Sequence, residues 1–332
     1  MRYIENESTD PHFNMAFDEY CLESLDEGEP VFYLWQNRPS VIIGLNQSAY
    51  AEVDLKYLED NGITLARRVT GGGAVYHDLG NLNYTITGRS HDLDADYPGY
   101  LHIVCDALRR LGVPATLSGR NDIMVEGKKC SGYAKRVWKD RLMVHGTLMY
   151  DVDFEHLSKA LAAPGSKVTA KGIASVRSRI ANLKDYLPQF KDIREFKDAL
   201  QEIMSEGATE PLPLPEGALR AISEMADGKF RAWEWTLGKS PLTAFHVSRK
   251  FACGTVEASF DIREGRIRSL AFGGDFLGNR PSQELSSRLE GCRFDTSGIS
   301  AVLEDLKQKG ESVKEYFDGL SENDLMDLLL SL

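Results

Sequence analysis

The sequence predicts a mixed α/β protein of two domains, and three observations support this prediction. Its length of 332 residues exceeds what most single domains need. Apolar runs typical of strands alternate with segments whose apolar residues recur at helical spacing. A proline-rich connecting segment and a Gly-Lys-Ser-Pro turn then precede a shorter C-terminal part. We therefore expect domains at residues 1–240 and 241–332.

Composition indicates a soluble protein of the cytoplasm. Residues are 42% hydrophobic and 27% charged, and no apolar run is long enough to span a bilayer. The first eight residues lack the apolar stretch of a secretory signal, so we expect a cytoplasmic location. A formal net charge of −11 disfavours non-specific binding to nucleic acid. The five scattered cysteines contain no C-x-x-C pair and indicate reduced thiols.

The N-terminal elements are predicted from capping residues and apolar runs. Asp10 and Pro11 begin a helix, as an N-cap and a first-turn proline. Residues 31–35 and 41–45 predict two adjacent strands, and residues 51–60 predict a helix. Trp35 has two interpretations: it packs in the core, or it lines a pocket for an apolar ligand.

Next comes a glycine-rich segment, Arg67-Arg68-Val69-Thr70-Gly71-Gly72-Gly73-Ala74-Val75-Tyr76-His77-Asp78. Three glycines in succession allow backbone N–H groups to approach an anion closely. Guanidinium groups suit phosphate oxygens, so the two arginines favour a phosphate-binding loop. The segment matches neither the Rossmann nor the P-loop spacing. The other interpretation is a glycine-rich hairpin turn with solvated arginines.

A helix at 97–111 leads to a predicted hairpin with its turn at Glu126 and Gly127, and the returning strand begins on two lysines. Alternation along that strand directs Cys130 to the face opposite Lys129. A long strand at 141–150 contains His145. No other histidine stands at metal-binding spacing from it, so a zinc site is not expected.

The rest of the chain gives helices at 154–162 and 193–204, separated by a basic loop at 171–180. Proline alternates through residues 210–215, which therefore form a connection. Beyond residue 241, a hairpin at 255–262 and 267–272 and helices near 282–289, 299–306 and 321–330 indicate a small α+β domain.

Several of these segments resemble the lipoate-protein ligases, which attach lipoate to a lysine of carrier domains at the expense of ATP. The resemblance is carried by four runs: Arg-Arg-Val-Thr-Gly-Gly-Gly-Ala-Val-Tyr-His-Asp-Leu-Gly-Asn at 67–81, Gly-Lys-Lys-Cys-Ser-Gly-Tyr-Ala at 127–134, His-Gly-Thr-Leu at 145–148, and Lys-Gly-Ile-Ala-Ser-Val-Arg-Ser-Arg-Ile at 171–180. This sequence has Thr70 where serine is usual, and Cys130 and Tyr133 within the lysine run. These departures leave the preferred acyl chain open.

The resemblance implies a catalytic domain of the class II synthetase-like kind shared by biotin and lipoate ligases, with a mixed sheet and an accessory C-terminal domain. It implies that lipoate and ATP give lipoyl-AMP and pyrophosphate, and that a carrier lysine then displaces AMP. The expected partners are free lipoate or octanoate, the lipoyl domains of 2-oxoacid dehydrogenase E2 subunits, and the glycine cleavage H protein. ATP and Mg²⁺ are expected as substrate and activating ion, without a tightly bound prosthetic group, nucleic acid or membrane. We expect a monomer.

The resemblance also assigns roles to residues. Lys129 matches the essential lysine, which would neutralise charge between the acyl carboxylate and the α-phosphate. The ATP or lipoyl-AMP site would contain Lys129 together with Arg68, Thr70, Gly71, Gly72, Gly73, Ala74, Val75, Tyr76, His77, Asn81 and Asn121. Lys129 and His145 would contact lipoate, and Asp122 is the candidate ligand for Mg²⁺.

Two alternatives remain open from the sequence. An acyltransferase of the same fold that works without ATP would need Cys130 as its nucleophile. A non-catalytic binder of carrier domains is the other. The joint presence of Arg68, the glycine segment and Lys129 argues against the binder.

Overall fold

A computed structural model describes residues 1–25, 28–90, 92–118, 122–162, 170–208, 210–240, 243–274, 276 and 278–331. The described residues form two compact units. The first contains those of Met1–Leu45, Gly62–Leu161 and Val168–Ala232, and the second contains Asn46–Asn61 and most of the chain from Trp233 onward. The segment 46–61 thus belongs with the C-terminal unit, which the sequence did not predict. The domain boundary at 240/241 stays a prediction.

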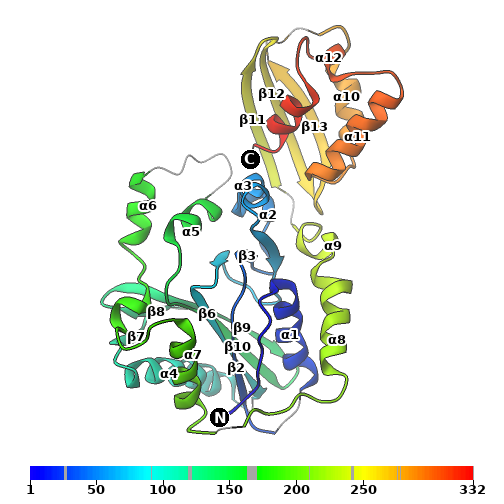
Figure 1. The fold of residues 1–332 in the computed structure, drawn as a ribbon. Coiled ribbons are helices and arrows are strands. Elements are labelled where there is room, and N and C mark those ends of the chain that lie inside the picture. Colours follow the sequence, from blue (N-terminus) through cyan, green and yellow to red (C-terminus); the bar gives the residue numbers. More distant parts are fainter. Residues whose placement is uncertain are drawn as a thin grey trace. The chain divides into compact units, whose positions relative to one another are not determined.

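A seven-stranded mixed sheet forms the centre of the first unit (Figure 1). Its order is β1-β2-β6-β10-β9-β8-β7, with β1 parallel to β2 and the other neighbours antiparallel. The strands are β1 (Arg2–Tyr3), β2 (Val31–Trp35), β6 (Asn81–Arg89), β7 (Ala115–Ser118), β8 (Asp122–Val125), β9 (Lys128–Trp138) and β10 (Arg141–Met149).

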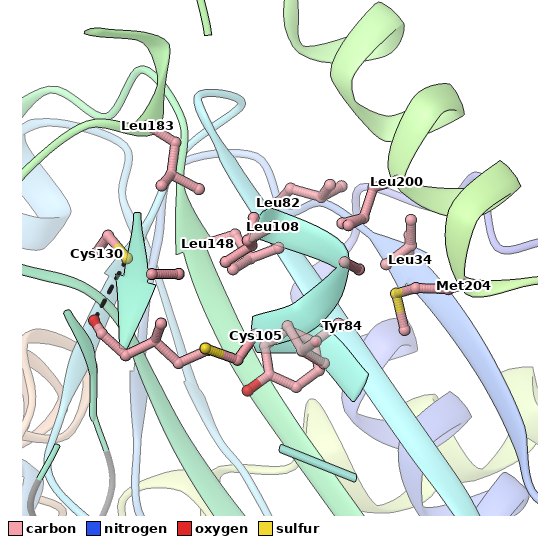
Figure 2. Packing of buried hydrophobic residues seen from close by; sticks show 14 of the residues in the cluster. Leu34, Leu82, Tyr84, Cys105, Leu108, Cys130, Leu148, Leu183, Leu200 and Met204 are labelled. Carbon is pink, nitrogen blue, oxygen red and sulfur yellow. Dashed lines mark hydrogen bonds between the residues drawn. The ribbon is translucent and has the colours of Figure 1, made fainter. Parts of the chain in front are cut away.

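Helices cover both faces of this sheet (Figure 1). On one face, α4 (Leu93–Arg110) and α7 (Ile193–Met204) bury apolar side chains against β6 and β10 in a continuous core, part of which Figure 2 shows. On the other face, α1 (Pro11–Ser24) packs against β6 and β10 and is flanked by α8 (Ala218–Met225). Because strand residues alternate between faces, polar residues of β6 and β10 that point away from the core meet α1.

A second, three-stranded sheet holds the glycine-rich segment. Its middle strand β3 (Ser40–Ile43) runs parallel to β4 (Thr64–Arg67) and antiparallel to β5 (Val75–His77). Since β4 and β5 lie on opposite sides of β3, the segment between them crosses from one edge to the other. The hairpin interpretation of this segment is therefore wrong, because its two flanking strands are not neighbours.

The second unit contains a three-stranded antiparallel sheet of order β11-β12-β13 with helices packed on one face. Its strands are β11 (Thr243–Phe251), β12 (Gly254–Arg263) and β13 (Arg266–Gly274). Its helices include α10 (Ser282–Leu289), α11 (Thr296–Gln308), α12 (Val313–Tyr316) and α13 (Glu322–Leu329), and also α2 (Ala49–Glu52) and α3 (Leu55–Asp60) from the N-terminal half. Tyr50 joins this core and lies edge-on to Phe294 at 5.3 Å.

Much of the local prediction is confirmed. The α1 helix begins as expected, with the Asp10 side chain accepting from the His12 N–H. The hairpin turn lies at Glu126 and Gly127, whose φ angles are 49° and 77°. The helix predicted at 193–204 has those bounds.

Three predictions are corrected. The strands at 31–35 and 41–45 are not adjacent, because β2 and β3 belong to different sheets. The helix at 51–60 is two short helices, because Asp54 caps a new start by accepting from the Tyr57 N–H. The basic loop at 171–180 begins as a helix, α6 (Ala170–Arg177), which follows α5 (Phe154–Ala160). In the described part of the chain, no helix is both long and apolar enough to cross a bilayer.

Candidate active site

A cavity of about 220 Å³ opens beneath the glycine-rich segment of the first unit. Its walls come from α1, β2, β3, β5, β6, β9 and β10 and from the glycine-rich segment itself. The lining residues are Met15, Trp35, Ile42, Arg68, Gly72, Gly73, Ala74, Val75, His77, Asn83, Lys129, Gly132, Tyr133, Ala134, His145, Gly146 and Thr147. Trp35 is thus both buried and part of the cavity wall.

Arg68 holds the glycine-rich segment in place. Its guanidinium donates to the carbonyls of Gly71 at 2.7 Å, Gly73 at 2.8 Å and Ile42 at 3.0 Å, and its Nε donates to Thr70 Oγ1 at 2.9 Å. Burial lowers the pKa of Arg68 to about 10, so the group stays charged at neutral pH. Most N–H groups of this guanidinium therefore stabilise the segment itself.

Close backbone contact in the same region explains two glycines. Gly72 adopts φ 92°, in the left-handed region that favours glycine. A Cβ on Gly44, just after β3, would lie 2.1 Å from the Gly72 carbonyl oxygen. A side chain at Gly44 would therefore displace the segment.

A buried carboxylate on α1 holds His145 against the segment. Asp18 Oδ2 lies 2.7 Å from His145 Nδ1, while Asp18 Oδ1 accepts from the hydroxyls of Tyr33 at 2.7 Å and Thr85 at 2.9 Å. Since all its partners are donors, Asp18 acts as an ionised acceptor, and His145 Nδ1 carries a hydrogen. Asp18 is 1% exposed, so water does not compete for these bonds.

The same chain of hydrogen bonds continues to Arg68. His145 Nε2 lies 2.7 Å from Thr70 Oγ1, which accepts from Arg68 Nε. Helix α1, strand β10 and the glycine-rich segment are thereby linked by one hydrogen-bonded network, Arg68 to Thr70 to His145 to Asp18.

Lys129 enters the cavity from the start of β9. Its Nζ lies 2.7 Å from Asp122 Oδ1, with the two side chains 37% and 32% exposed. Its backbone is held from the other side, because Lys129 N donates to the Arg179 carbonyl at 2.8 Å and Ala181 N donates to the Lys129 carbonyl at 3.0 Å. Residues that follow α6 thus fix the strand that carries the lysine.

Cys130 faces away from the cavity, as the strand alternation predicted. Its side chain is buried in the core of the large sheet, and its Sγ–H donates to the Ile123 carbonyl at 3.4 Å (Figure 2). Burial raises the pKa of the Cys130 thiol to about 12, far from the range of reactive thiolates.

The structure brings together most of the residues proposed from the sequence. Those that line the cavity are Arg68, Gly72, Gly73, Ala74, Val75, His77, Lys129 and His145. Thr70, Gly71, Tyr76 and Asn81 lie outside this lining, although Asn81 donates to the lining residue Asn83 at 2.9 Å. Asn121 lies outside the described residues.

In the described part of the chain, no three His, Cys, Asp or Glu side chains gather as they would around a resident ion. Mg²⁺ that arrives with a nucleotide needs only one or two carboxylates besides the phosphates. Asp122, partly exposed beside Lys129, is a carboxylate of this kind.

Sequence reasoning missed Asp18, the residue that orients His145. A signal was present, because Asn14 and Asp18 stand four apart among the apolar residues of α1, and both are buried. Two polar residues on the buried face of a helix indicate an internal polar network.

We expect Asp18→Ala to lower the free energy of unfolding of the first unit by about 3 kcal/mol or more, because three buried donors lose their acceptor and each costs about 1–3 kcal/mol. Tyr33→Phe removes one donor and leaves the carboxylate paired, so its cost should be smaller. Urea denaturation of both variants measures the difference. An Asp18→Ala variant as stable as the unsubstituted protein would contradict the network.

Comparisons with known proteins match both parts of the chain. The model of the lipoyl protein ligase A/B catalytic domain matches residues 10–205, and that of the bacterial lipoate protein ligase C-terminus matches residues 240–329. The chain is 37% identical to the lipoate-protein ligase LplJ of Bacillus subtilis (strain 168), over 99% of this chain and 100% of that protein.

Solved structures agree with these matches. A bipartite lipoate protein ligase from Thermoplasma acidophilum, studied with its E2 lipoyl domain, superposes with a TM-score of 0.66 at 34% identity and covers 72% of this chain and 96% of its own. A lipoate-protein ligase A bound with ATP superposes with a TM-score of 0.63 at 32% identity. The match covers 72% of this chain and 98% of that protein's chain. With a cavity lined by the glycine-rich segment and Lys129, and with matches to both of its parts, the chain belongs to the lipoate-protein ligase family.

Proposed function

We propose that this protein activates free lipoate with ATP and attaches it to a lysine of lipoyl carrier domains. One observation carries the proposal: a single cavity joins the glycine-rich segment, Lys129 and His145 in a chain that aligns end to end with a lipoate-protein ligase. The related structures that contain ATP and that accompany an E2 lipoyl domain support both substrates.

The reaction has two steps. A lipoate carboxylate oxygen attacks the α-phosphorus of ATP, the bond to the β-phosphate oxygen breaks, and pyrophosphate leaves. The ε-amino group of the carrier lysine then attacks the acyl carbon of lipoyl-AMP, an amide forms, and AMP leaves with the bonding electron pair while the amine loses a proton.

Lys129 supplies positive charge where two anions meet. A carboxylate and a triphosphate repel each other, and an ammonium between them lowers this repulsion and stabilises charge that develops in the transition state. The same ammonium polarises the acyl carbonyl in the second step. Asp122, 2.7 Å away, holds the ammonium before substrate binds and offers an oxygen to the Mg²⁺ of ATP.

The glycine-rich segment and His145 serve the two ends of the intermediate. Backbone N–H groups of residues 71–77 and the charge of Arg68 favour the phosphate of the adenylate. His145, oriented by Asp18, and Trp35 bound the part of the cavity that suits an acyl chain. Thr70, Tyr76, Asn81 and Asn121 complete the nucleotide side in this proposal.

The proposal extends to partners and location. The carriers are lipoyl domains of E2 subunits and the glycine cleavage H protein, octanoate can replace lipoate, and the enzyme works as a monomer in the cytoplasm. The net charge of −11 fits an enzyme whose substrates are small molecules and proteins rather than nucleic acid.

The transferase alternative is disfavoured by the site. It requires Cys130 as an acyl carrier, but this thiol lies in the core behind the strand and its pKa is raised to about 12. A thioester at Cys130 would require the core to open.

Lys129→Ala should keep the fold and lower adenylate formation about 1,000-fold, because the lost charge acts mainly in the transition state. Lipoate-dependent release of pyrophosphate measures this step. Lys128→Ala is the matched control, because its side chain is exposed at the neighbouring position, and it should change the rate little. Near-full pyrophosphate release by Lys129→Ala would contradict the assignment of the lysine.

Intact mass spectrometry of an apo lipoyl domain tests the whole proposal. After incubation with this protein, Mg²⁺ and free lipoate, the domain should gain one lipoyl group only when ATP is present, and Cys130→Ser should behave in the same way. A gain without ATP from an acylated donor, lost in Cys130→Ser, would establish the transferase. No gain with any donor would favour a carrier-binding protein.

A further inference from the structure

His77 lies in the cavity wall at the end of β5, in an environment that fixes its hydrogen bonding. It is 3% exposed and lies edge-on to Trp35, with ring centroids 6.1 Å apart. Its Nδ1 lies 3.0 Å from the amide nitrogen of Asn37, in the connection between β2 and β3. Its Nε2 is buried and finds no acceptor among the described residues.

A chain of buried amides determines which nitrogen of His77 carries the hydrogen. Asn14 Nδ2 contacts the carbonyl oxygens of Ser8 and Gln36, both at 2.9 Å. Because carbonyl oxygens only accept, this atom of Asn14 must be the amide nitrogen, which settles the orientation of the side chain. Its oxygen accordingly accepts from Asn6 Nδ2 at 3.0 Å.

The orientation of the Asn14 amide determines that of the Asn37 amide, which in turn determines the tautomer of His77. Asn14 Nδ2 also lies 2.8 Å from the side-chain oxygen of Asn37, so its two hydrogens are shared among three acceptors. Because an amide nitrogen cannot accept, the Asn37 atom that faces it is the oxygen, and Asn37 turns its nitrogen towards the imidazole. Asn37 Nδ2 then donates to His77 Nδ1. An Nδ1 that accepts cannot carry a hydrogen, so the hydrogen of the neutral ring lies on Nε2.

Burial and the charge of Arg68 keep the His77 ring neutral, because both lower its pKa, to about 3. Arg68 comes from the glycine-rich segment. The neighbours on α1 and the β2–β3 connection, Asn14 and Asn37, are uncharged, and His145 of β10 contacts Asp18. The ring thus presents a neutral N–H donor over the working pH range.

We propose that His77 Nε2–H is a catalytic hydrogen-bond donor to an oxygen of the acyl-phosphate group of lipoyl-AMP, and that Asn37 and Asn14 are positioning residues that hold its tautomer. The inference rests on the proposed function. The cavity that His77 lines also contains Lys129, and the Arg68 guanidinium already donates to the carbonyls of Gly71 and Gly73 in the segment and of Ile42 in β3. The Nε2–H of His77 therefore remains available to donate a hydrogen bond to the substrate.

A neutral donor suits this position for a chemical reason. Oxygens of the acyl phosphate gain charge both when the carboxylate attacks phosphorus and when the amine attacks the acyl carbon. A preorganised N–H in a water-poor site stabilises that charge without reorganisation. A neutral imidazole gives up no proton to the adenylate or to the attacking amine, so it does not interfere with the proton that the amine must lose.

The tautomer is measured by ¹⁵N NMR of the histidine-labelled, full-length protein. His77→Gln identifies the resonances by their loss. We expect Nδ1 of His77 to be unprotonated and Nε2 protonated from pH 6 to 8, and we expect the Nε2 proton to move downfield when 5′-O-(N-lipoylsulfamoyl)adenosine, a non-hydrolysable analogue of lipoyl-AMP, binds. A proton on Nδ1, or an Nε2 proton that the analogue leaves unchanged, would overturn the proposal.

Kinetics give a second, independent readout. We expect His77→Leu to lower lipoate-dependent pyrophosphate release about 100-fold. His77→Gln, which places an amide N–H near the position of Nε2, should retain more activity than His77→Leu. His102→Gln is the control, because His102 is exposed on α4 and contacts the Pro98 carbonyl of its own helix.

The outcomes separate the two proposals. If unsubstituted protein and His102→Gln both fail to release pyrophosphate, the proposed function is wrong. If they are active and His77→Leu is equally active, His77 is no donor and this inference is wrong. If His77→Leu fails to fold, two other results together would overturn the inference about His77. These are a His77→Gln variant as active as His102→Gln, and an Nε2 proton resonance in the unsubstituted protein that does not move when the analogue binds.

Discussion

The site depends on one constraint: the charged guanidinium of Arg68 is buried, so its hydrogen-bond acceptors must come from the protein itself. The guanidinium gathers the carbonyls of the glycine-rich segment, and through Thr70 and His145 it is connected to the carboxylate of Asp18 on α1. Positive and negative charge thus stand at opposite ends of one hydrogen-bonded chain. Because a buried charge without partners is costly, the three elements that carry these residues keep their mutual geometry.

Because Arg68 binds its carbonyls, the glycine-rich segment has a defined backbone conformation before substrate binds. Glycines at 44 and 72 permit the close backbone approach, and the segment crosses between two edges of a small sheet instead of turning back on itself. Lys129 enters from a different sheet and is clamped by residues after α6. In the proposed reaction, the segment therefore acts together with a lysine whose strand is held independently.

Local sequence features predicted local structure well. The cap at Asp10, the turn at Glu126 and Gly127, and the alternation that hides Cys130 all follow from properties of one or a few neighbouring residues. The glycine-rich segment stood out because its residues are consecutive, and Lys129 was proposed from the resemblance to the family; in the structure, both line one cavity. The pairing of strands was not predicted correctly, because the separation of β2 and β3 into two sheets depends on segments that are distant in the sequence. Asp18 and Asn37 were missed for the same reason: each acts on a histidine 127 or 40 positions away.

The most direct test of the account is a crystal structure of the full-length protein with 5′-O-(N-lipoylsulfamoyl)adenosine. We predict that the sulfamoyl group lies beneath the glycine-rich segment, within hydrogen-bonding distance of Lys129 Nζ, with the lipoyl chain between Trp35 and His145. An analogue bound outside this cavity, or one whose sulfamoyl group lies away from Lys129, would contradict the assignment of the active site.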